Sequence, residues 1–181
     1  ARVVLGTVDG ARLRFTTAAR VCLGFSSVFV GGGISGFFLG QPSIDSYLHG
    51  TYFVVGHFHF VMGVAAMFGI FAGTYFWFPK IYGRMMNETL GKWHFVLTLI
   101  GVYATFMPMH YLGLAGNVRR YSAFTAEYMK GALPLHRLTT IAAFFTAVAH
   151  LIFLCNLVRS RFRGPQAPQN PWGPAPLTWP T

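Results

Sequence analysis

The sequence predicts an all-α membrane protein whose four transmembrane helices form a bundle or part of one. Of the 181 residues, 54% are hydrophobic and only 10% are charged, and the mean hydropathy is +0.48. Four segments are long enough to cross a hydrocarbon core of about 30 Å at about 1.5 Å per helical residue. The sequence contains no fifth segment of this kind and no internal repeat, so nothing divides the four into separate domains.

The four predicted spans are residues 21–39, 51–78, 93–114 and 138–158. Residues 1–20 form a basic lead-in on the inner side, and this layout differs from that of a cleaved signal peptide. The first span contains Gly31, Gly32, Gly33 and Gly36, which permit close approach of another helix. Residues 159–181 form an inner-side tail that is first basic and then Pro-rich, and we expect its end to be disordered or draped over a partner.

The positive charges are distributed unequally between the two sides that these spans define. The net charge is +10, and if the N-terminus is cytoplasmic or matrix-facing, its side holds ten of the fourteen Lys and Arg residues: Arg2, Arg12, Arg14, Arg20, Lys80, Arg84, Lys92, Arg159, Arg161 and Arg163. The opposite side holds Arg119, Arg120, Lys130 and Arg137. This bias follows the positive-inside rule and indicates contact with membrane lipid. No compact basic patch with interleaved aromatic residues occurs in a loop, which argues against a nucleic-acid partner.

Two histidines, His57 and His59, lie inside the second span. An imidazole in hydrocarbon is costly unless it is hydrogen-bonded or coordinates a metal, so this pair indicates a functional site. Two residues along an α-helix turn by about 200°, so the rings should leave on nearly opposite faces and cannot share one metal. Each could hold its own haem, whose iron is commonly bound by histidine, and Gly56 and Gly63 would let flat macrocycles approach. A pair of histidines that hydrogen-bond to other helices is the alternative.

Two adjacent arginines, Arg119 and Arg120, follow the third span on the same side as the histidine pair. Arginines at a membrane surface can be lipid anchors. Their guanidinium groups can also pair with the carboxylates of a buried ligand through a rigid fork of donors. Because they share a side with His57 and His59, we favour contact with the propionates of a bound haem.

Four runs of the sequence carry a specific resemblance to a known family. They are IDSYLHGTYFVVGHFHFV (44–61), FWFP (76–79), NETLGKWHF (87–95) and PMHYLGLAGNVRRY (108–121). They resemble subunit I of the haem–copper terminal oxidases, cytochrome c oxidase above all. The resemblance covers residues 23–121, and the last span agrees in position and character only. It implies that the four spans are the last four of the twelve transmembrane helices of that subunit.

The resemblance implies a role for each candidate residue. His57 matches the catalytic axial ligand of the high-spin, oxygen-binding haem of the a3 type, and His59 matches one of two axial ligands of the low-spin haem of the a type. Arg119 and Arg120 match the pair that contacts the haem propionates. His110, in the fourth run, is expected to support the propionate region through hydrogen bonds.

Asp45 and His49 match outer-side positions near the propionates of the high-spin haem. In the family, His49 would also help to bind magnesium. Here Gly50 follows this histidine where the family commonly has Asp. A hard cation prefers oxygen ligands, so the loss of the carboxylate puts a magnesium site in doubt.

The resemblance also implies that part of the active site lies outside this sequence. In the family, the copper ligands, the second ligand of the low-spin haem and the main proton-uptake channels belong to earlier helices. The chain alone therefore cannot reduce oxygen. We expect a complex in which another chain carries the N-terminal part of subunit I; a sequence that represents only part of the subunit is the alternative.

The resemblance predicts the C-terminal part of the catalytic subunit of a respiratory, proton-translocating cytochrome c oxidase that reduces oxygen to water. Expected partners are the N-terminal part of subunit I with its copper ligands, oxidase subunits II and III, cytochrome c as donor and membrane lipid. We expect a bacterial plasma membrane with both termini cytoplasmic; the mitochondrial inner membrane is the alternative. Competing functions are a quinol oxidase, a nitric oxide reductase of the same superfamily, and a non-catalytic membrane scaffold.

Overall fold

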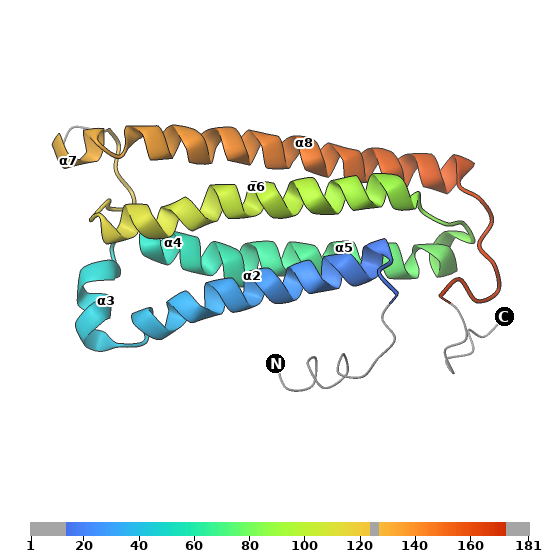
Figure 1. The fold of residues 1–181 in the computed structure, drawn as a ribbon, viewed down its shortest axis with the longest axis horizontal. Coiled ribbons are helices and arrows are strands. Elements are labelled where there is room, and N and C mark those ends of the chain that lie inside the picture. The colour runs from blue at the N-terminus through green and yellow to red at the C-terminus, as the bar shows by residue number, and fades with distance from the viewer. Residues whose placement is uncertain (1–13, 124–126, 173–181) are drawn as a thin grey trace.

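The computed structural model describes residues 14–123 and 127–172, and four long helical rods lie side by side in it (Figure 1). The described residues contain no β-strand, and the predicted all-α class is confirmed. The first rod is α2 (Thr17–Leu39), and the second is continuous through α4 (Tyr52–Phe58), η1 (His59–Val64) and α5 (Ala65–Tyr82). The third and fourth rods are α6 (Glu88–Leu114) and α8 (Leu133–Arg163).

Successive rods run in opposite directions, so their connections gather at two ends of the bundle (Figure 1). One end, called the α3 end, carries the short helices α3 (Pro42–Leu48) and α7 (Glu127–Lys130). The other, called the tail end, carries the start of α2, the loop 83–87 and residues 164–172. Of the predicted lead-in and tail, residues 1–13 and 173–181 lie outside the described part of the chain.

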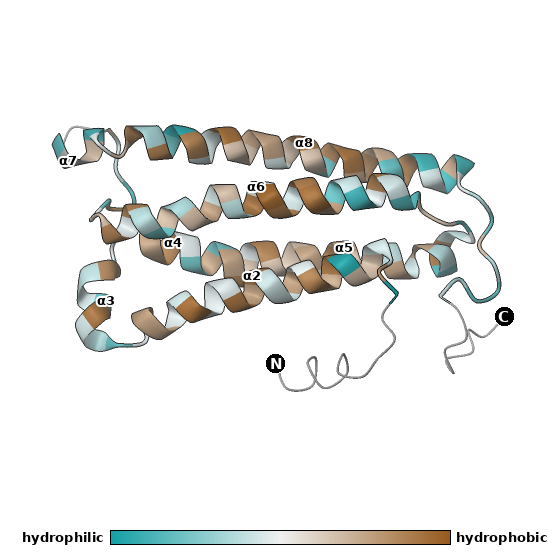
Figure 2. Cartoon of the chain, viewed as in Figure 1, coloured by the Kyte–Doolittle hydropathy of each residue, from teal (hydrophilic) through white to brown (hydrophobic). Residues whose placement is uncertain are grey.

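Each rod is long and apolar enough to cross a membrane. Hydrophobic residues dominate the middle of the rods in Figure 2. Many large apolar side chains point outward, including Phe37, Met62 and Phe144, which are 78%, 70% and 73% exposed. Such a surface is unfavourable in water, so the exterior of this bundle is built to face lipid or further helices.

The rods extend beyond the predicted spans, mainly at the tail end. Their ends are set by local capping groups and not by the point at which the sequence stops being hydrophobic. The side chain of Thr16 accepts a hydrogen bond from the Ala19 N–H at 3.3 Å, and that of Asn87 accepts one from the Leu90 N–H at 2.9 Å. Both satisfy an N–H that a helix start leaves without a partner. Gly83 ends α5 in the left-handed conformation, with φ of 63°.

The second rod changes from α-helix to π-helix at His59. A π-helical turn is rare, and such turns frequently lie at functional sites. Because the segment is apolar on all sides, hydrophobic periodicity does not predict the change. The π-helical turn begins at His59, so the step from His57 to His59 lies before its widened part and the two rings keep opposite faces, while Phe60 is 1% exposed in the core.

Hydrogen bonds between polar side chains hold the tail end together. Thr17 donates to the Glu88 carboxylate from its N–H at 3.0 Å and from its hydroxyl at 2.8 Å, which joins α2 to α6. Asn156, which is fully buried, accepts from the Asn87 N–H at 3.1 Å and donates to the Asn87 carbonyl at 3.0 Å, which joins α8 to the start of α6. Ser160 donates to Asn156 at 3.0 Å.

We predict that Asn156→Ala destabilises the assembled protein. The substitution removes both hydrogen bonds between the Asn156 side chain and the Asn87 backbone and leaves the Asn87 N–H with the Ser160 hydroxyl at 3.3 Å. Each lost hydrogen bond costs about 0.5–1.5 kcal/mol. The measurement is the midpoint of thermal unfolding of the purified complex, which should fall. Cys155→Ala is the matched control, because Cys155 is exposed on the same helix, and its effect should stay within about 0.5 kcal/mol. Equal midpoints for both variants would show that this link does not stabilise the bundle.

The described part of the tail lies against this chain itself. The Met85 N–H donates to the Pro165 carbonyl at 2.9 Å, the Ala167 N–H donates to the Gly83 carbonyl at 2.9 Å, and the Arg84 guanidinium donates to the Gly164 carbonyl at 2.6 Å. The loop between α5 and α6 therefore fixes the start of the tail.

Candidate functional site

His57 lies on the face of the second rod that packs against α2. Its Nδ1 is 2.8 Å from the carbonyl oxygen of Gly32 and 3.0 Å from Oγ of Ser35. A Cβ on Gly36 would lie 2.9 Å from Cε1 of the His57 ring, so glycine at this position lets the ring lie against α2. Two of the four predicted glycine positions, Gly32 and Gly36, thus border the histidine directly.

His59 lies on the opposite face of the same rod, toward α6. Its Nδ1 is 2.8 Å from the carbonyl oxygen of Val55, one turn earlier in the helix. Its ring stacks on Phe106 of α6 with 4.9 Å between the ring centroids and 16° between the planes. Phe58, which separates the two histidines in sequence, has its ring centroid 4.3 Å from that of His59.

These contacts determine which ring nitrogen of each histidine can bind a ligand. A carbonyl oxygen only accepts, so Nδ1 carries the proton in both rings and Nε2 keeps its lone pair. Among the described residues, no hydrogen bond reaches Nε2 of either ring, and both side chains are half-buried. A backbone acceptor at one ring nitrogen and a free lone pair at the other is the arrangement of a metal-binding histidine.

The two rings cannot serve one metal ion, because one contacts α2 and the other α6. In the described part of the chain, no group of three or more His, Cys, Asp or Glu side chains is placed to hold a metal ion. A single histidine suffices on the protein side of a haem, since the macrocycle supplies the other ligands of the iron. The donor set therefore suits two separate haems, one on each face of the rod.

The loop that carries the arginine pair is held against the start of α4. The Tyr52 N–H donates to the Asn117 carbonyl at 3.0 Å, and the Arg119 N–H donates to the Gly50 carbonyl at 2.9 Å. Arg119 is half-buried and Arg120 is exposed, and within the described residues neither guanidinium has a hydrogen bond or ion pair. The structure thus places both arginines at the α3 end, near the start of the helix that carries the histidines, with their donors free.

Asp45 of α3 pairs with His49, the residue that caps the end of this helix. Nδ1 of His49 is 3.2 Å from Oδ2 of Asp45, and the side chains are 72% and 32% exposed respectively. The backbone of Gly50, next in the chain, accepts the hydrogen bond from Arg119. The pair lies at the α3 end with the arginines, but it offers a cation no third carboxylate or imidazole among the described residues.

His110 has a packing position between the second rod and α6. Its Nδ1 donates to the Phe106 carbonyl at 3.2 Å, and a Cβ on Gly56 would lie 2.8 Å from its ring. The expectation that Gly56 leaves room for a macrocycle is therefore wrong, because the His110 ring fills that space. Gly63 does border open space, since a Cβ placed on it would lie 3.9 Å from its nearest neighbour, Cδ2 of His59.

Three further polar side chains, of His94, His150 and Asn117, are buried or half-buried and do not belong to the site predicted from the sequence. His94, near the start of the predicted span 93–114, is 1% exposed, and its Nδ1 is 3.2 Å from the Tyr75 hydroxyl. His150 contacts the rings of Phe71 and His94 at centroid distances of 5.3 and 6.0 Å. Asn117 is 1% exposed, in the loop beside the arginines. Hydropathy alone does not reveal these positions, because burial depends on which helix face meets a neighbour.

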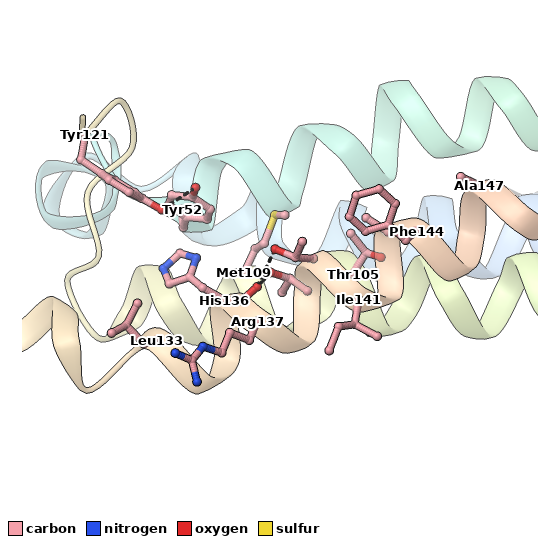
Figure 3. A pocket seen from close by; sticks show the side chains of 13 residues that line it. Tyr52, Thr105, Met109, Tyr121, Leu133, His136, Arg137, Ile141, Phe144 and Ala147 are labelled. Carbon is pink, nitrogen blue, oxygen red and sulfur yellow. Dashed lines mark hydrogen bonds between the residues drawn. The ribbon is translucent and has the colours of Figure 1, made fainter. Parts of the chain in front are cut away.

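A recess of about 880 Å³ opens between α6 and α8 toward the α3 end. Figure 3 shows Tyr52, Tyr121 and His136 at one end of it and Phe144 and Ala147 at the other. The hydroxyls of Tyr52 and Tyr121 are 3.2 Å apart. Burial, together with this hydrogen bond, raises the pKa of Tyr121. The recess is thus polar at one end and apolar at the other, and it contains none of the site residues predicted from the sequence.

Comparison with known proteins identifies the family. A family model described as Cytochrome C and Quinol oxidase polypeptide I matches residues 3–145. The chain belongs to this family. The relative named cytochrome c oxidase subunit 1 of a Synechocystis species is 43% identical over 176 residues, which are 97% of this chain and 31% of that protein. The relative named cytochrome c oxidase polypeptide 1 of Halobacterium salinarum is 41% identical over 167 residues, which are 92% of this chain and 28% of that protein.

The fold agrees with this membership in the oxidase polypeptide I family. A solved heme-copper terminal oxidase dimer matches with a TM-score of 0.69 and 17% sequence identity, over 90% of this chain and 31% of that one. The resemblance noted in the sequence is thereby confirmed, and the chain is a multi-pass membrane protein whose described residues contain four helices long and apolar enough to span a membrane. It spans about a third of the length of the curated relatives it matches.

Proposed function

We propose that this chain supplies the last four helices of the catalytic subunit of a respiratory cytochrome c oxidase. The observation that carries the proposal is the pair His57 and His59, each with Nδ1 hydrogen-bonded to a backbone carbonyl and Nε2 free, on opposite faces of one helix. His57 would bind the high-spin haem, where oxygen is reduced, and His59 the low-spin haem. When bound, the two haems supply the one-electron and oxygen chemistry of the reaction.

The protein residues hold the groups in place and exclude water. The Gly32 and Val55 carbonyls fix the orientation of the two imidazoles. The Phe58 and Phe106 rings lie against the His59 ring, with centroids at 4.3 and 4.9 Å. An apolar wall of this kind keeps the local dielectric low, which strengthens electrostatic control of a redox centre.

Arg119 and Arg120 would bind the haem propionates. Their guanidinium groups have no acidic partner in the described residues, and they share the α3 end with the helix start that leads to His57. A guanidinium donates two parallel hydrogen bonds to a carboxylate. Asp45 and His49 lie at the same end and would border the propionates of the high-spin haem.

The rest of the active site must come from elsewhere in the assembly. Copper, which faces the high-spin haem, would be held by the N-terminal part of subunit I, and subunits II and III and cytochrome c would complete the complex. We place the assembly in a bacterial plasma membrane with the tail end of this bundle toward the cytoplasm, because most Lys and Arg residues lie at that end.

The electron donor is tested directly by activity of the purified complex. Oxygen consumption is measured with reduced cytochrome c and, separately, with a short-chain quinol. The proposal predicts turnover with cytochrome c. Turnover with quinol alone would favour a quinol oxidase of the same family, and a complex without haem in a pyridine haemochrome spectrum would favour a non-catalytic scaffold.

We predict that Arg119→Gln and Arg120→Gln lower the midpoint potential of the haem whose propionates they bind. Loss of a positive charge stabilises the oxidised haem relative to the reduced haem, by about 1–2 kcal/mol for a charge roughly 10 Å away at an effective dielectric constant of about 20. The half-buried Arg119 should have the larger effect. Spectroelectrochemical titration of the complex measures both potentials.

Lys130→Gln is the control for the arginine variants, because it removes a positive charge at the same end. Lys130 is exposed and pairs with Glu127 at 2.7 Å, so its loss should leave both potentials unchanged. If Arg119→Gln also leaves them unchanged, the arginines are lipid anchors instead.

A further inference from the structure

Ser35 of α2 forms a triangle of hydrogen bonds with the His57 ring. Its side chain is 6% exposed, and it lies four residues before the end of α2, toward the α3 end. Its Oγ is 2.6 Å from the Gly32 carbonyl oxygen and 3.0 Å from Nδ1 of His57, and that Nδ1 is itself 2.8 Å from the same carbonyl oxygen. Three polar atoms from two helices thus meet at one point, in a region otherwise filled by apolar groups.

The direction of each hydrogen bond in the triangle follows from donor and acceptor chemistry. The Gly32 carbonyl can only accept, so it takes the Ser35 hydroxyl proton and the His57 Nδ1–H. If Ser35 instead donated to an unprotonated Nδ1, two lone pairs would face each other across the 2.8 Å between Nδ1 and the carbonyl oxygen. The ring N–H therefore has two acceptors, the carbonyl oxygen and a lone pair of the Ser35 hydroxyl.

His57 and His59 differ in the number of acceptors at their Nδ1–H groups. The N–H of His59 has one acceptor, the Val55 carbonyl at 2.8 Å. The N–H of His57 has two acceptors, the Gly32 carbonyl and the Ser35 hydroxyl. The hydroxyl belongs to a side chain, so a substitution can remove it without altering the backbone. Acceptors at Nδ1–H draw the proton away from the ring and make Nε2 a stronger donor to a metal.

We propose that Ser35 is a positioning residue for His57, which orients its ring and increases the donor strength of Nε2 toward the high-spin haem iron. This inference rests on the proposed function, because it requires a haem at His57. Ser35 acts through the imidazole and touches neither haem nor oxygen. A stronger Nε2 donor stabilises the oxidised iron, so Ser35 lowers the potential of the high-spin haem relative to a site without it.

The test uses the intact oxidase complex with Ser35→Ala, Ser35→Cys and Ser35→Thr. Resonance Raman spectra of the reduced enzyme report the iron–histidine stretching band, and spectroelectrochemistry reports the high-spin potential. Ser35→Ala should retain both haems, shift the band to lower frequency and raise the potential. Ser35→Cys, with a weaker acceptor of similar shape, should give a smaller shift in the same direction. Ser35→Thr keeps the hydroxyl and should restore both values.

Ser26→Ala is the matched control on the same helix. Ser26 is half-buried and donates to the Cys22 carbonyl at 3.2 Å, away from either histidine, so its loss should change neither reading. An unchanged band in Ser35→Ala would overturn the inference, as would an equal shift in Ser26→Ala. Loss of the haem from both Ser35→Ala and Ser35→Cys would also contradict it, because a tuning contact is not required for ligation. A wild-type complex without an iron–histidine band contradicts the proposed function itself.

Discussion

His57→Ala should remove the high-spin haem signal and abolish oxygen reduction while the low-spin signal remains. The residue supplies the ligand on the α2 side of the rod; α2 itself carries no histidine, and His59 of the same rod lies against α6. Changing an outer-shell partner of a metal ligand commonly costs about 10–100-fold in metal affinity or activity, so loss of the ligand itself should cost more than about 100-fold in turnover. Optical spectra and oxygen consumption of the purified complex measure the two effects.

His150→Leu is the control for the loss of a membrane histidine in general. His150 lies on α8, whereas His57 and His59 lie on the second rod. It contacts the rings of Phe71 and His94. It should retain both haem signals. A His57→Ala complex with a normal high-spin spectrum would show that His57 is a packing residue.

His59→Ala should have the complementary effect. The low-spin haem signal should disappear while a high-spin haem at His57 remains, because the two rings lie on opposite faces and contact different helices. Turnover with cytochrome c should fall by more than about 100-fold, since electrons then lack their route to the oxygen-binding haem. Low-temperature spectra of the reduced complex, recorded beside those of His57→Ala, separate the two signals.

The two variants must differ for the assignment to hold. If His59→Ala removed the high-spin signal and His57→Ala the low-spin one, the two ligands would be exchanged. If either substitution removed both signals from an assembled complex, the rings would not act as independent ligands.

The sequence predicted the parts of this site that depend on helical geometry alone. Helical periodicity placed His57 and His59 on opposite faces, and the structure puts one against α2 and the other against α6. Charge bias placed Arg119 at the same end of the bundle as the start of their helix, where its N–H bonds to Gly50. Both inferences need only the direction of a helix and the position of a residue along it.

What the sequence did not predict depends on how neighbouring helices meet. The π-helical turn at His59 lies in a segment that is apolar throughout, so no period marks it. Ser35 gains its partner from the second rod, 22 residues later in the chain. Gly56 was interpreted as open space, but the ring of His110, from α6, fills it. These contacts join residues far apart in sequence, and a single chain without its relatives gives no signal of them.

An electron cryo-microscopy map of the intact oxidase complex that contains this chain is the most direct test of the two haem ligands. The proposed function predicts two separate macrocycles on opposite faces of the second rod, with one iron bonded to Nε2 of His57 and the other to Nε2 of His59, while each Nδ1 keeps its carbonyl partner. A map in which either imidazole bonds through Nδ1, or in which both rings pack against protein with no macrocycle beside them, would contradict it.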